Sequence, residues 1–105
     1  MAETPGATRV LLIEGEAQIA AGLAMILGAT GFAVEVANSG ETGLDLARMC
    51  DFDLVLLGPN PPALADGGDM AARLRLARID RPMRLLAATR DPGGDPAALQ
   101  INPLP

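Results

Sequence analysis

The chain has 105 residues, a net charge of −5 and a hydrophobic fraction of 50%, with Phe32 and Phe52 as its only aromatic side chains. A chain of this length suits one domain around a single aliphatic core, because it buries roughly 65% of its unfolded surface. The basic residues are all arginines, and both histidine and lysine are absent, which excludes catalysis or metal binding by histidine, Schiff-base formation and phosphate binding by lysine.

Other features narrow the class of protein further. Cys50 is the only cysteine, so neither a disulfide framework nor a cysteine-rich metal site is expected. The acidic balance and the scarcity of aromatic rings argue against a nucleic-acid-binding surface. Residues 1–6 lack the features of a signal peptide, and the longest apolar run, residues 19–27, is far shorter than a membrane span. We therefore expect a cytoplasmic protein with a flexible lead-in at residues 1–7 and one domain at residues 8–105.

The first third of the chain predicts a strand, a helix and a second strand. Residues 9–13 form a continuous apolar run, which is typical of a strand buried on both faces. Residues 17–27 carry apolar side chains at helical spacing, and Gly28 or Gly31 is expected to end that helix. Residues 32–37 alternate with one polar interruption, as expected of a strand nearer the edge of a sheet.

The middle of the chain predicts a second helix and the central strand. Asn38 is the expected N-cap, with Glu41 three residues further on, and residues 42–49 continue the helix. Residues 53–57 form the most hydrophobic strand and are expected at the centre of the sheet. Residues 58–68 are rich in proline and glycine and predict a loop.

The last third predicts a helix at residues 69–77, a strand at 83–88, a polar loop at 89–96 and a short fifth strand at 98–101. Strands that alternate with helices imply right-handed crossovers and a parallel sheet. In such sheets functional residues gather at the carboxyl ends of the strands.

Several segments together resemble a bacterial response-regulator receiver domain, most closely those of DNA-binding regulators of the OmpR class. They are residues 9–14 (RVLLIE), 31–34 (GFAV), 39–44 (SGETGL), 52–57 (FDLVLL), 73–82 and 102–103 (NP). The resemblance covers residues 8–88 and resumes at 101–103. It implies a flavodoxin-like, doubly wound α/β fold and a role in two-component signalling and phosphorelay.

The resemblance also locates a phosphorylation site that has lost its chemistry. A working receiver needs an acidic pair for a divalent ion, an acceptor aspartate, a hydroxyl residue and a lysine, because cations must offset the charge on the transferred phosphoryl group. Here the acidic pair falls on Glu14 and Gly15, the acceptor on Gly58, the hydroxyl residue on Ala87 and the lysine on Asn102. The sequence therefore predicts a pseudo-receiver with no catalytic residue, no metal and no cofactor.

A misalignment by one residue is the alternative for each single change. Glu16 is then available in place of Gly15, and Thr89 in place of the hydroxyl residue, but no lysine exists to replace Asn102. A metal site formed by Glu16, Asp66 and Asp69 is a further alternative, which we disfavour because their loop is rich in glycine.

The chain is also truncated relative to receivers, which have a fourth helix between the last two strands and a fifth helix at the end. Residues 89–97 hold two prolines and two glycines and are too few for a parallel crossover, which needs about a dozen residues. The fifth strand is therefore expected to be missing from its family position or to come from another chain. The alternative is that the chain's own tail folds over the sheet.

Apolar residues without their helical cover, next to a basic cluster, predict a protein contact surface on the third helix and the last two strands. We expect it to bind a second copy of the chain as a homodimer, with no direct contact to nucleic acid or membrane. The alternative to a partner surface is that the arginines form the solvent-exposed face of the third helix. The predicted interface residues are Arg73, Arg75, Arg78, Arg84, Leu85, Leu86, Leu99, Ile101 and Leu104.

The sequence thus predicts a non-enzymatic, phosphorylation-independent regulatory module. One alternative is a sensor whose pocket, vacated at Gly15, Gly58 and Ala87, holds a small anion or metabolite. Another is a phosphotransfer protein with a displaced acceptor. The partner, the pathway and the completeness of the chain are not determined by the sequence.

Overall fold

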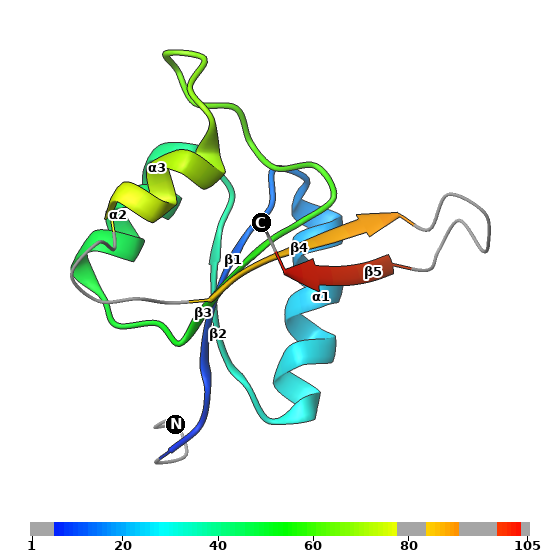
Figure 1. The fold of residues 1–105 in the computed structure, drawn as a ribbon. Helices are drawn as coiled ribbons and strands as arrows, with labels where there is room; N and C mark the ends of the chain where they lie inside the picture. The colour runs from blue at the N-terminus through cyan, green and yellow to red at the C-terminus, as the bar shows by residue number, and fades with distance from the viewer. Residues whose placement is uncertain (1–5, 78–83, 91–98, 104–105) are drawn as a thin grey trace.

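The computed structural model describes residues 6–77, 84–90 and 99–103 (Figure 1). They form a five-stranded sheet in the order β2-β1-β3-β4-β5. The elements are β1 (Arg9–Ile13), α1 (Ala17–Thr30), β2 (Ala33–Ala37), α2 (Gly40–Met49), β3 (Leu54–Leu57), α3 (Met70–Ala77), β4 (Arg84–Arg90) and β5 (Leu99–Pro103). The predicted doubly wound α/β fold is confirmed, with four strands in parallel.

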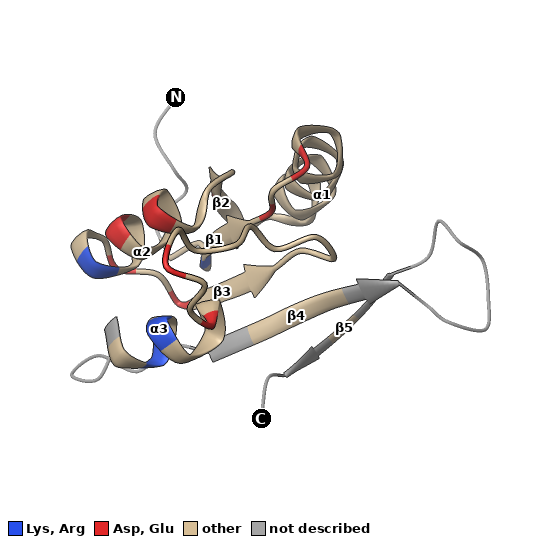
Figure 2. Cartoon of the chain, turned by 90° about the horizontal axis from the view of Figure 1, so that it is seen from above, with Lys and Arg blue, Asp and Glu red and all other residues tan. Residues whose placement is uncertain are grey.

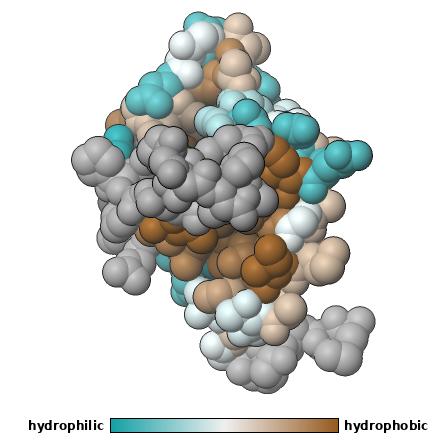
Figure 3. All heavy atoms as spheres, turned by 90° about the vertical axis from the view of Figure 1, so that its right-hand side faces the viewer, coloured by the Kyte–Doolittle hydropathy of each residue, from teal (hydrophilic) through white to brown (hydrophobic). Residues whose placement is uncertain are grey.

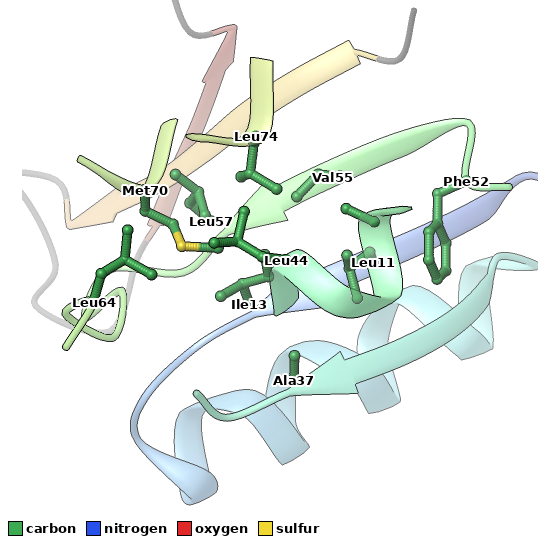
Figure 4. Close-up of a cluster of buried hydrophobic side chains, with 11 residues drawn as sticks. Leu11, Ile13, Ala37, Leu44, Phe52, Val55, Leu57, Leu64, Met70 and Leu74 are labelled. Carbon is green, nitrogen blue, oxygen red and sulfur yellow. The ribbon is translucent and has the colours of Figure 1, made fainter. Parts of the chain in front are cut away.

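Side chains of β1 and β3 alternate between two apolar cores, one on each face of the sheet. Leu11 and Ile13 point to the side of α2 and α3, and Val10 and Leu12 point to the side of α1. All four are essentially inaccessible to solvent. Figure 4 shows the first core, in which Leu74 of α3 joins the strand residues.

The helices lie in two layers, with α1 on one side of the sheet and α2 and α3 on the other (Figure 2). Helix α1 ends where Gly31 adopts a left-handed conformation with φ of 109° and donates to the carbonyls of Gly28 and Leu27. Of the two glycines expected to end this helix, Gly28 and Gly31, the structure uses Gly31.

Helix α2 begins one residue later than the sequence indicated. Ser39, not Asn38, is the N-cap, and its hydroxyl accepts a hydrogen bond from the Thr42 N–H at 3.1 Å. The Asn38 amide instead donates to the Glu14 carbonyl at 3.0 Å. Asparagine and serine are both good N-cap residues. Asn38 does not cap the helix because its side chain is hydrogen-bonded to the Glu14 carbonyl.

Strand β5 pairs with β4 in the antiparallel direction. This corrects the expectation that the strand would be missing or supplied by another chain. The connection from Arg90 to Leu99 is too short for a crossover helix, but an antiparallel neighbour needs only a hairpin loop. The same chain therefore fills the edge position with a reversed strand, and β4 extends to Arg90 to pair with it.

No fourth or fifth helix occurs among the described residues. In the described part of the chain no helix is long and apolar enough to cross a membrane.

Leu74→Ala should test the packing of α3 on the sheet. Leu74 is fully buried, so its truncation is expected to lower the free energy of unfolding by about 2–5 kcal/mol. Leu76→Ala is the matched control, because Leu76 on the same helix is 69% exposed and its loss should change stability by less than about 0.5 kcal/mol. Urea unfolding measures both. Equal effects would contradict the orientation of α3.

Candidate functional site

The carboxyl edge of the sheet brings together the backbone of the positions that the sequence marked as a degenerate phosphorylation site. In the strand register Ile13 lies beside Leu57, and Leu57 beside Ala87. Glu14 and Gly58 directly follow two of these residues. The reversed β5 still places the backbone of Asn102 opposite Ala87.

Gly58 is buried, and the Glu14 side chain lies over it. A Cβ built on Gly58 would meet Glu14 Oε1 at 2.2 Å and Glu14 Cβ at 2.8 Å, both far inside van der Waals contact. The position therefore has neither a side chain nor room for one. The Glu14 carboxylate occupies the volume into which an acceptor side chain would project.

The Glu14 carboxylate, fully buried, is held by backbone donors. Its Oε1 accepts from the Asn60 N–H at 2.9 Å, and its Oε2 accepts from the Glu16 N–H at 2.6 Å. These charge-assisted bonds compensate for part of the hydration that burial removes. They also tie the β3–α3 loop, through Asn60, to the start of α1, through Glu16.

Further bonds complete this connection between the two loops. The Gly15 N–H donates to the Asn60 carbonyl at 2.9 Å, and the Asn60 amide lies 3.3 Å from Glu16 Oε2. A Cβ on Gly15 would approach the Asn60 carbonyl oxygen to 3.1 Å and Pro62 to 3.6 Å. We call Glu14, Gly15, Glu16, Gly58 and Asn60 the carboxylate latch.

Comparison with known proteins adds the family. No protein-family model matches the chain. It is 37% identical over 83 residues to the cell cycle transcriptional regulator CtrA of Caulobacter vibrioides, an alignment covering 79% of this chain and 36% of that protein. The cell cycle response regulator CtrA of Brucella ovis is 35% identical over 79 residues, or 34% of its length.

Solved structures agree on the fold. The response regulator receiver domain protein (CheY-like) from Methanospirillum hungatei superposes with a TM-score of 0.67 at 24% identity, over 82% of this chain and 66% of that one. The chain belongs to the response-regulator receiver family. It spans about a third of the length of the curated regulators it matches, as the 36% and 34% coverage shows.

As a receiver, this chain uses the residues at its phosphorylation edge for internal contacts. The Glu16 N–H donates to the Glu14 carboxylate, and the Glu16 carboxylate lies 3.3 Å from the Asn60 amide, so whether Glu16 substitutes for Gly15 stays a prediction. Ala87 is half-buried. The side chains of Thr89 and Asn102 lie outside the described residues, and whether Thr89 supplies a hydroxyl stays a prediction.

The vacated pocket expected at Gly15 and Gly58 is not formed, because Glu14, Asn60 and Pro62 fill that space. The three carboxylates of the alternative metal site are engaged separately: Asp66 with Arg73, Asp69 with the Ala71 N–H, and Glu16 with Asn60. Among the described residues, no cluster of three potential metal ligands occurs.

Sequence reasoning missed Asn60 and the second use of Glu41. Glu41 was expected to support the start of α2, but its carboxylate accepts from the Ala65 N–H at 3.0 Å and holds the far end of the β3–α3 loop. Both contacts join residues that are distant in the sequence, so no local pattern indicates them. A cavity of about 270 Å³ lies beside this contact, between the loop, α2 and α3, lined in part by Glu41, Arg48 and Arg73.

The predicted interface residues are only partly covered by the structure. Arg73 pairs with Asp66, and Arg75 is exposed at the end of α3. Leu86 is half-buried and Ile101 is 49% exposed. Arg78 and Leu104 lie outside the described residues, as do the side chains of Arg84, Leu85 and Leu99.

Gly58→Ala should test the latch. The new methyl group would collide with Glu14, so we expect a loss in the upper part of the about 1–3 kcal/mol range typical of overpacking, measured by urea unfolding. Gly15→Ala is the control at the same edge, with a smaller cost because its nearest contact is 3.1 Å away. In a Glu14→Ala background the cost of Gly58→Ala should fall below about 1 kcal/mol. An undiminished cost there would rule out the collision with Glu14 as the cause.

Arg73→Ala should raise the pKa of Asp66. The hydrogen bond from the Arg73 guanidinium, followed by that from the Gly68 N–H, holds the pKa of this carboxyl below its ordinary value of 3.8. A lowered pKa adds stability that is present above pH 3.8 and is lost as the pH falls through the lower folded-state pKa. Carboxyl NMR titration should show the Asp66 pKa rise in Arg73→Ala and stay unchanged in Arg75→Ala. A rise of equal size in both variants would contradict the assigned cause.

Proposed function

We propose that this receiver is phosphorylation-independent and regulates by protein contact. It acts in the cytoplasm, in a bacterial two-component or transcription-control pathway, and it is not an enzyme. The names of its relatives support the setting, since they are cell cycle regulators and response regulators. Direct contact with nucleic acid or membrane forms no part of the proposal, in keeping with the net charge of −5.

The observation that carries the proposal is the Glu14 carboxylate over Gly58. Phosphoryl transfer to a receiver needs an acceptor carboxylate and cations around it. The acceptor position has no side chain, and Glu14 reaches within 2.2 Å of a Cβ built there. With lysine absent from the chain, the cation that would offset the transferred charge is also missing.

The latch supports a fixed output state. Phosphorylation acts as a switch where the added charge orders or releases a segment of the chain. Here the β3–α3 loop is already held by the 2.9 Å bonds from Asn60 N–H to Glu14 and from Gly15 N–H to the Asn60 carbonyl. A loop held by internal bonds has no need of phosphate to order it, so the domain presents one surface constantly.

A small-anion sensor at the same edge is the less favoured alternative. The volume at Gly58 is filled, and it is filled by a negatively charged group. An anion entering there would have to displace Glu14 and face its charge at short range.

The proposed contact surface is α3 with β4 and β5, and the simplest partner is a second copy of the chain. Arg73 and Arg75 lie on α3, on one face of the sheet. Leu86 packs with the core on the α1 side of the sheet, and Ile101 pairs with Ala88 of that core, so the two faces of the proposed surface meet at the β5 edge. Strand β5 also lies at the edge of the sheet, where unpaired backbone groups favour a neighbour.

Incubation with acetyl phosphate and Mg²⁺, followed by intact mass spectrometry, tests the proposal. The wild-type chain should gain no adduct of about 80 Da, the mass of a phosphoryl group, while a conventional receiver treated in parallel gains one. Gly58→Asp should also stay unmodified, because its carboxylate would compete with Glu14 and no lysine is present. A stoichiometric adduct mapped to any aspartate of the wild-type chain would overturn the proposal.

A further inference from the structure

Helix α1 differs from the other described helices in having no charged residue. Its 14 residues, AQIAAGLAMILGAT, include only Gln18 and Thr30 as polar side chains. Ala20 and Leu23 face the sheet, yet Met25 on the opposite side is 72% exposed and Ile26 on the flank of the helix is 64% exposed. A helix that is apolar all round is normally buried on all sides.

The surroundings of Met25 on the helix are unusually small. The positions three and four residues away, which are its neighbours on the helix surface, are Ala21, Gly22, Gly28 and Ala29. A Cβ built on Gly22 or on Gly28 would meet nothing within 4 Å. Packing within the chain therefore gives no reason for either glycine, although glycine destabilises a helix. Because Gly22 and Gly28 have no side chains, the backbone of a second helix can approach closely beside Met25.

An apolar strip of the sheet lies on the same face as α1. Leu54 and Leu86 are half-buried and pack against the α1-side core. Ala88 belongs to that core and pairs directly with Ile101. Directly paired residues share a face of the sheet, so Ile101, at 49% exposed, lies on the α1 side as well. Figure 3 views the molecule from the side of α1 and β5 and shows apolar surface next to the atoms drawn in grey.

We propose that the outward side of α1, around Met25 and Ile26, docks against the same helix of a second copy of this chain, with Ile101 at the margin of the contact. We call this surface the α1 face. It goes beyond the proposed function by adding a second contact surface, on the other face of the sheet from α3. It rests on the apolar surface alone and does not require the loss of phosphorylation.

Charge decides for a second copy as the occupant. Two copies that each carry −5 repel one another, so they associate best where neither presents a charge, and α1 presents none. A two-fold contact brings a surface against itself, and an uncharged surface is compatible with itself. An anionic lipid surface would instead need basic residues on this helix.

The size of the face sets the strength of the contact. A 14-residue helix is about 21 Å long and about 10 Å wide, which gives roughly 200 Å² for helix against helix. A standard interface buries about 800 Å² on each partner. The helix contact alone therefore makes a weak, concentration-dependent dimer, and contacts from the adjoining strip are needed to strengthen it.

Sedimentation velocity over a wide concentration range, with Met25→Glu and Met49→Glu, tests this inference. Met49 is the matched control, because it is 79% exposed at the end of α2, whose buried side packs on the opposite face of the sheet. Met25→Glu should weaken dimerisation at least about tenfold by placing two carboxylates near the two-fold axis, and Met49→Glu should change it less than about twofold. Far-UV circular dichroism should show both variants folded.

Cross-linking supplies an independent readout. In a Cys50→Ser background, Met25→Cys should oxidise to a disulfide-linked dimer, since the Cα atoms must lie within about 7 Å for that bond, while Met49→Cys should not. A wild-type chain that stays monomeric at the highest concentration, or equal behaviour of the Met25 and Met49 variants in both assays, would overturn the α1 face. A monomeric wild-type chain would also contradict the homodimer proposed for α3, β4 and β5, whereas equal behaviour of the Met25 and Met49 variants would overturn the α1 face alone. Neither result bears on the phosphorylation assay.

Discussion

The buried carboxylate of Glu14 is the interaction around which the functional edge of this receiver is organised. It lies over Gly58 and accepts bonds from the backbone of Glu16 and Asn60. A buried carboxylate without partners is costly, so the loops that supply these N–H groups are held where the carboxylate needs them. Gly58 is required for the same reason, since any side chain there would displace Glu14.

This arrangement gives a structural role to the residues at the edge where we propose that phosphorylation has been lost. Removing the acceptor side chain would leave a cavity at the centre of the sheet edge, and cavities cost stability. Glu14 fills that volume and connects the β1–α1 turn to the β3–α3 loop. A carboxylate at this edge of the sheet thus holds the backbone of two loops together.

The second constraint is the length of the chain between the last two strands. The Arg90–Leu99 connection is too short for a helical crossover, so β5 returns antiparallel to β4. Strand β5 thereby forms the edge of the sheet next to β4. Leu86 and Ile101 are left partly exposed on the same face of the sheet as the uncharged α1, which is the physical basis for proposing protein contact on this side of the molecule.

The sequence by itself determined the parallel strands and the three helices, because apolar periodicity is a local property, and its resemblance to receivers located a glycine at the acceptor position. It offered Gly28 and Gly31 as helix stops, and the structure uses Gly31. Only the tertiary structure decided that Glu14 fills the space over Gly58, that Asn38 leaves the α2 cap to Ser39, and that β5 is reversed. These outcomes depend on contacts between residues far apart in the chain, and such contacts exist only once the sheet has formed.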